Sequence, residues 1–68
     1  MTNSELRERI ADRINGTNAA RNRNLLTRRL IDGVHIEPLA EEFELSVTQT
    51  RRIIKQGKAI IYDMQKPG

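Results

Sequence analysis

The pattern of apolar and polar positions first predicts a helix near the start of the chain. Apolar residues stand at every fourth position from Leu6 to Ile14, which places them on one helical face. A Thr-x-x-Glu capping box begins at Thr2, and Asn15-Gly16 can adopt the left-handed geometry that ends a helix. We therefore predict a first helix over residues 4–15.

A second helix is predicted over residues 18–32, where apolar residues lie mainly on one side and arginines occupy much of the rest. Thr17 or Asn18 can cap its start, and Asp32-Gly33 places a glycine just past its end. Its apolar positions are Ala19, Ala20, Leu25, Leu26, Leu30 and Ile31.

Residues 36–55 predict two short helices joined by a tight turn. Pro38 falls in the first turn of a helix over 36–43, where a missing N–H costs nothing. Ser46 and Gln49 form a second capping box, which starts the next helix at Val47. The inward positions are Leu39, Ala40, Phe43, Leu45, Thr50 and Ile53. With this spacing two crossed helices share one small core, as in a helix-turn-helix.

Helical periodicity continues past Gly57 through Ile60, Ile61 and Met64. Either one helix spans about 47–65 with a weak point at the glycine, or a separate helical segment follows over 58–65. A glycine in a helix interior costs roughly 1 kcal/mol relative to alanine, which packing can offset. The whole pattern predicts an all-α fold: one domain over residues 1–68, a compact bundle of four to five helices.

The amino-acid composition excludes several kinds of site and function. The 68 residues include no cysteine and one histidine, so neither a disulfide framework nor a metal site is expected. The chain also lacks a phosphate-binding glycine loop, and the adjacent carboxylates of Glu41 and Glu42 diverge on a helix. We therefore expect no cofactor and no catalysis. No apolar run is long enough for a membrane span. Phe43 and Tyr62 are the only aromatic residues, so we do not expect the chain to bind single-stranded nucleic acid by stacking of successive bases.

Charge is segregated along the chain. Residues 1–36 carry seven arginines and four acidic residues, a net +3; residues 37–46 carry four glutamates, a net −4; residues 47–68 carry five cations and one aspartate, a net +4. Basic clusters of this kind are typical of proteins that bind polyanions, although a solvated surface explains them equally well.

The stretch from Leu25 to Gly33 followed by Ile36 to Lys55 resembles region four of bacterial sigma factors and the small phage and bacterial transcription regulators that share its helix-turn-helix. The resemblance covers about residues 24–57. In that family a helix ends in Asp/Glu-Gly, and two crossed helices follow after a short approach. The resemblance implies an all-helical DNA-binding domain in which the helix that starts at Val47 enters the major groove.

Most core positions of the motif match. Leu39 and Ala40 match the apolar-then-small pair of its first helix, Phe43 and Leu45 the two positions around the turn, Ser46 the cap of the recognition helix, and Ile53 its buried anchor.

Three positions depart from the family pattern. Glu44 stands where the turn often has glycine; a left-handed backbone there costs glutamate roughly 1 kcal/mol, so we expect a slightly different turn. Thr50 replaces a usual Val or Ile, and His35 stands where Ser or Thr often caps the first helix.

The candidate DNA contacts lie at the start and on the outer face of the helix from Val47: Ser46, Thr48, Gln49, Arg51, Arg52, Lys55 and Gln56. Gln49 suits a bidentate contact to adenine and Arg52 one to guanine, whereas Arg51 and Lys55 suit phosphate. Capping already explains Gln49. For Arg52 the alternative is a surface ion pair with a glutamate of the preceding helix, and DNA contact is the favoured role. Further candidate phosphate contacts are Arg21, Arg23, Arg28, Arg29, His35 and Lys58. An exposed helix face explains the four arginines equally well.

The sequence therefore predicts a sequence-specific double-stranded DNA-binding protein, a small transcription regulator in the cytoplasm and nucleoid. We expect a second copy of the chain as one partner, bound through residues 58–65. RNA polymerase or another protein is a further expected partner. Two alternatives remain open: a protein-interaction module, and a DNA-packaging or recombination accessory protein built on the same motif.

Overall fold

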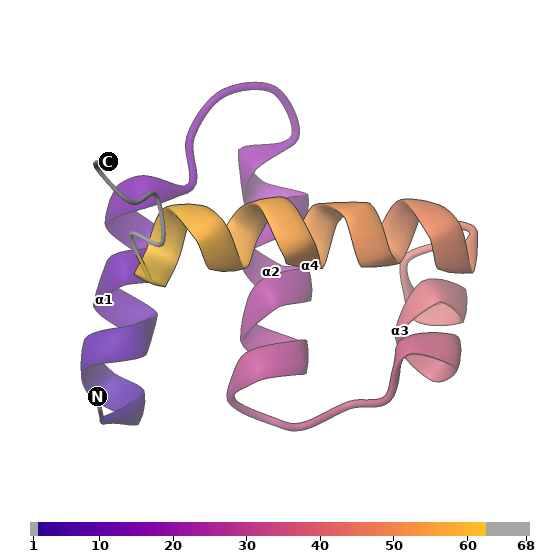
Figure 1. The fold of residues 1–68 in the computed structure, drawn as a ribbon, viewed down its shortest axis with the longest axis horizontal. Coiled ribbons are helices and arrows are strands. Elements are labelled where there is room, and N and C mark those ends of the chain that lie inside the picture. The colour runs from indigo at the N-terminus through magenta and orange to yellow at the C-terminus, as the bar shows by residue number, and fades with distance from the viewer. Residues whose placement is uncertain (1, 63–68) are drawn as a thin grey trace, which may run out of the picture.

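The computed structural model describes residues 2–62, which form four α-helices: α1 (Asn3–Arg13), α2 (Ala19–Leu30), α3 (Ile36–Glu42) and α4 (Val47–Tyr62). The described part contains no strand, so the all-α prediction is confirmed there. Figure 1 shows α4 running across the molecule, with α3 at its N-terminal end, α1 at its C-terminal end and α2 behind its middle. α4 packs against each of the other three helices. In this part of the chain no helix is long and apolar enough to cross a membrane.

The first helix begins as the sequence predicts. The Thr2 hydroxyl accepts a hydrogen bond from the Glu5 backbone N–H, and the Glu5 carboxylate accepts one from the Thr2 N–H, at 3.2 and 2.8 Å. The helix ends at Arg13, two residues earlier than predicted, because Ile14 is already extended. The left-handed turn falls at Gly16, with φ of 92°.

The predicted side-chain cap of α2 is wrong. Asn18 precedes the helix in a left-handed conformation with φ of 63°, and its side chain makes no capping hydrogen bond. Asparagine tolerates this conformation better than most residues, so it serves the turn and not the cap. The helix ends at Leu30, and Gly33 continues the chain with φ of 74°.

The turn between α3 and α4 is left-handed despite its glutamate. Glu44 has φ of 56°; its N–H donates to the Glu41 carbonyl, and the Leu45 N–H donates to the Ala40 carbonyl at 2.8 Å. These two bonds make a Schellman motif, the usual end of a helix before a left-handed residue. The expectation of a different turn is therefore wrong: the turn is kept, with glutamate in the place that glycine fills best.

α4 is continuous through Gly57 as far as Tyr62, so the alternative of a helix break at the glycine is wrong. Gly57 is buried, and a Cβ at this position would lie 2.5 and 2.6 Å from the Leu26 Cδ atoms. The glycine thus allows α2 and α4 to approach closely. Residues 63–65 of the predicted segment lie outside the described residues.

Two apolar clusters hold the helices together. The first joins α1 to the centre of α2 and the end of α4, through Leu6, Ile10, Ile14, Leu26 and Ile61. The second joins α2 to α3 and the start of α4, through Leu25, Leu39 and Ile54, with Val34, Ile36, Phe43, Leu45 and Ile53 packed against it. Of the positions predicted to face inward, Leu39, Ala40 and Thr50 are buried, whereas Phe43, Leu45 and Ile53 are only partly buried. The buried anchor of α4 is Ile54 and not Ile53 as predicted.

Candidate nucleic-acid interface

One exposed face of α4 gathers most of the predicted contact residues. A single shallow depression on this face is lined by Thr48, Arg51, Arg52, Lys55, Gln56 and Ala59. These positions recur at spacings of three and four, so they share one side of the helix. The opposite side carries the buried Thr50, Ile54, Gly57 and Ile61, and α4 packs against α1, α2 and α3. Burial of one face therefore determines which side chains α4 presents.

The remaining two predicted contacts, Ser46 and Gln49, form the N-terminal cap of α4. The Gln49 N–H donates to the Ser46 hydroxyl at 3.0 Å, and the Ser46 N–H donates to the Gln49 Oε1 at 3.1 Å. The Gln49 amide oxygen is thus engaged, and a bidentate contact to adenine requires the cap to open or to share that oxygen. The cap is the role that the geometry supports for Gln49.

Three cationic side chains lie next to one another on the exposed flank of α4. Arg51 and Lys55 are four residues apart, and Lys58 follows three residues later; all three are exposed. Like charges at these spacings destabilise a helix by a few tenths of a kcal/mol per pair. The first turn of α4 contains no acidic residue to balance the nearby cations.

No acidic residue within 2–62 relieves this charge. Both ion pairs of the described chain involve Arg28, so the ion pair with a glutamate of α3, which was the alternative role of Arg52, does not form there. α4 therefore presents unbalanced positive charge on the face that the fold leaves outside.

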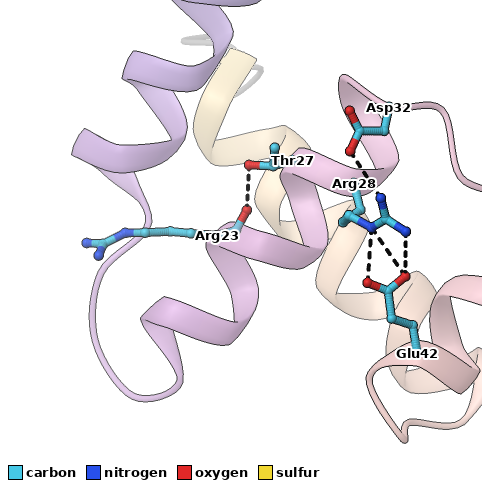
Figure 2. Close-up of polar contacts among 5 residues, drawn as sticks. All are labelled: Arg23, Thr27, Arg28, Asp32 and Glu42. Atoms are coloured by element: carbon cyan, nitrogen blue, oxygen red, sulfur yellow. Dashed lines mark hydrogen bonds and ion pairs between the residues drawn. The ribbon is translucent and has the colours of Figure 1, made fainter.

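The arginines of α2 behave differently, because the fold uses their guanidinium groups. Figure 2 shows Arg28 between Glu42 of α3 and Asp32, with bonds of 2.9 to 3.3 Å. The hydrogen bonds and charge of Glu42 raise the pKa of Arg28 above its ordinary value. This guanidinium bridges α2 to α3 and is a poor candidate for phosphate.

Arg21, Arg23 and Arg29 are also tied locally. Arg23 donates to the Ile14 carbonyl at 2.8 Å and Arg29 to the Val34 carbonyl at 3.0 Å, so each holds a connection between helices. Arg21 donates to the neighbouring Asn22 amide oxygen. His35 is exposed at the N-cap position of α3, and its side chain makes no capping hydrogen bond.

A groove lies beside this depression, with which it shares Arg51, Lys55 and Ala59, and it was not predicted from the sequence. Four cations line it: Arg29, Arg51, Lys55 and Lys58. Its apolar lining comes from Ile36, Ile54 and Ala59, on α3 and α4. The spacing of the α4 cations could have suggested their common flank. The addition of Arg29 and Ile36 depends on how α2 and α3 pack, which no local pattern reveals.

The described residues contain no cluster of three or more potential metal ligands. Comparisons of the chain with protein families, curated sequences and solved structures find no match.

Proposed function

We propose that this chain is a sequence-specific double-stranded DNA-binding protein of the transcription-regulator type. In this proposal α3, the turn at Glu44 and α4 act as a helix-turn-helix, and α4 enters the major groove. The observation that carries the proposal is the exposed row of cations on α4, which no acidic residue within 2–62 neutralises. A row of this kind costs helix stability, and a polyanion would relieve the cost.

Roles follow from position on α4. Arg52, Thr48 and Gln56 line the outward depression, where side chains of a recognition helix reach base edges. Arg51 and Lys55 line both this depression and the neighbouring groove, which suits contact with the phosphate backbone at its side. Arg52 is the residue that we expect to carry sequence preference, because guanidinium pairs bidentately with guanine.

The short reach of a recognition helix favours self-association on DNA. One recognition helix contacts only a few base pairs, so we expect two copies on two half-sites. Ile60 and Tyr62 are 47% and 38% exposed at the end of α4, within the segment 58–65 that we propose as the dimer contact. The same exposed apolar residues favour a second candidate function, docking of RNA polymerase or another protein. The setting we propose is the cytoplasm and nucleoid.

Titration of fluorescently labelled duplex DNA at several salt concentrations tests the main proposal. If α4 contacts three to four phosphates, the logarithm of affinity should fall with the logarithm of salt with a slope of about −3. Weak salt dependence, or no binding between about 50 and 200 mM salt, would overturn the proposal.

Matched charge reversals locate the contact. Arg52→Glu on α4 should weaken binding at least about tenfold, since each lost specific contact is worth about 1–3 kcal/mol. Arg7→Glu changes the net charge equally but lies exposed on α1, so its effect should be much smaller. Equal losses from both variants would indicate attraction by total charge and not a contact surface. Binding-site selection with the wild type and Arg52→Ala then tests whether Arg52 determines sequence preference.

A further inference from the structure

The groove between α2, α3 and α4 combines two kinds of surface that double-stranded DNA does not need together. Four cations line it, namely Arg29, Arg51, Lys55 and Lys58. The other lining residues, Ile36, Ile54 and Ala59, are apolar. A phosphate backbone is fully hydrated and gains little from apolar contact, whereas an amphipathic ligand gains from both surfaces.

We propose that this groove binds an acidic amphipathic segment of a partner protein. Its apolar side chains would cover Ile36, Ile54 and Ala59, and its carboxylates would meet the surrounding cations. Charge complementarity supports this occupant, because no ion pair within residues 2–62 engages any of the four cations. The Arg29 guanidinium is also held in place by its hydrogen bond to the Val34 carbonyl.

A second copy of this chain is a poorer occupant. Its own acidic segment, α3, buries Leu39 and Ala40 in the core and exposes Glu37, Pro38 and Glu41. Docking of that face would satisfy the cations but would bring little apolar surface to cover Ile36 and Ile54.

The site has a regulatory consequence, which rests on the proposed DNA binding. Arg51 and Lys55 line both the groove and the outward depression of α4. A segment that neutralises these two side chains removes them from the phosphate backbone. DNA and the acidic segment therefore compete for the same protein molecule.

The test uses two labelled peptides of about 12 residues, three helical turns long. Both carry the same glutamates; the first has three leucines along one face, and the second has serine in their place. Anisotropy titration of the full chain should show the leucine peptide binding at least about tenfold more tightly, because the apolar lining distinguishes the two. Equal affinities, or no binding of the leucine peptide, would overturn the proposal.

Two charge reversals at exposed positions place the peptide. Lys58→Glu changes a residue that lines only the groove, and Arg52→Glu changes one that lines only the depression. The first should weaken the leucine peptide about tenfold and the second should leave its affinity within about twofold. The reverse pattern would contradict the site. Circular dichroism of each variant checks that the helices remain folded.

A competition experiment between DNA and peptide, and the molecular mass of the protein in solution, distinguish the remaining outcomes. Leucine peptide should release labelled duplex DNA, and binding of both ligands at once would overturn the regulatory part. If the peptide binds the groove but no duplex binds at all, the proposed function fails while the groove assignment stands. A dimer by light scattering that dissociates in Arg29→Glu, a groove residue outside the proposed dimer contact 58–65, would show the groove to be covered by a second copy, contrary to the proposal.

Discussion

Glu44 is a residue held in a conformation that suits a different amino acid. Its φ of 56° lies in the left-handed region, and it follows the C-terminal end of α3, where a negative charge opposes the helix dipole. Both effects disfavour glutamate. The turn persists because the two hydrogen bonds of the Schellman motif and the packing of Leu45 hold it in place.

Glu44→Gly should therefore raise the free energy of unfolding by about 1 kcal/mol. Glu44→Ala is the matched control, because it removes the charge but keeps a Cβ in the left-handed region. Denaturant unfolding of the three proteins should place glycine above alanine by about 1 kcal/mol. If alanine stabilises as much as glycine, the charge and not the backbone is the cause.

Glu5 makes the first capping box sensitive to pH. The hydrogen bonds with the Thr2 backbone and side chain hold the pKa of this exposed carboxyl below its ordinary value. Because the folded-state pKa is the lower one, the stabilisation is present above the unfolded-state pKa and is lost as the pH falls through the folded-state pKa.

Glu5→Gln keeps an acceptor at this position but removes the titration. The difference in unfolding free energy between wild type and Glu5→Gln should therefore change in the acid range, below about pH 5, with the wild type losing more stability. Thermal unfolding at a series of pH values measures it. A difference that stays constant with pH would contradict the assignment.

At the scale of helices, the crossing of α2 and α4 depends on one missing side chain. Gly57→Ala should gain about 1 kcal/mol of helix propensity. It should lose more from overpacking, because the new Cβ meets the fully buried Leu26 at distances down to 2.5 Å. We expect a net destabilisation of about 1–2 kcal/mol, measured by denaturant unfolding.

A double-mutant cycle isolates this contact. Leu26→Ala removes the Cγ and both Cδ atoms that the new Cβ would meet, so Gly57→Ala should be neutral or stabilising in that background. The coupling energy should be at least about 1 kcal/mol. Additive effects would mean that the glycine serves helix geometry and not the approach of α2.

The elements that were predicted well are those whose cause is local. Both capping boxes, at Thr2 and Ser46, join residues three apart, so the sequence reveals each partner. The helix continues through Gly57, which was one of the two predicted alternatives, but the reason for the glycine lies on another helix, at Leu26, and could not be read from the local sequence.

The candidate site likewise contains features that local sequence predicts and features that depend on how the helices pack. The outward row from Thr48 to Gln56 follows from helical periodicity. The structural role of Arg28 could not be predicted, because its partner Glu42 is fourteen residues away in the sequence and on another helix. The pairing of Arg29 with Ile36 in one groove exists only in the folded chain.

For the molecule as a whole, α1 supports the proposed interface without lying in it. Its apolar residues pack against Leu26 and Ile61, and Arg9 and Arg13 donate to the carbonyls of Ile61 and Ile60 at the end of α4. Cations suit this position, because a helix C-terminus carries partial negative charge. α4 is thus held at one end by α1 and at the other by α3.

Because α4 belongs to both clusters, damage to α1 should destabilise the distant turn as well. Ile10 is 2% exposed in the α1 cluster, and Ile10→Ala should cost about 2–4 kcal/mol. That is a large share of the total for a domain of this size, about 0.05–0.15 kcal/mol per residue.

Native-state hydrogen exchange can show whether the loss is shared. In Ile10→Ala the amide of Ile54, in the other cluster, should lose as much protection as those of α1, because the two clusters unfold together. Arg7→Ala, an exposed change on the same helix, should stay within about 0.5 kcal/mol of wild type. If Ile54 keeps its protection while α1 exchanges freely, α3 and α4 fold independently of the first helix. The α2–α4 crossing at Gly57 would then suffice to hold the α4 face in place.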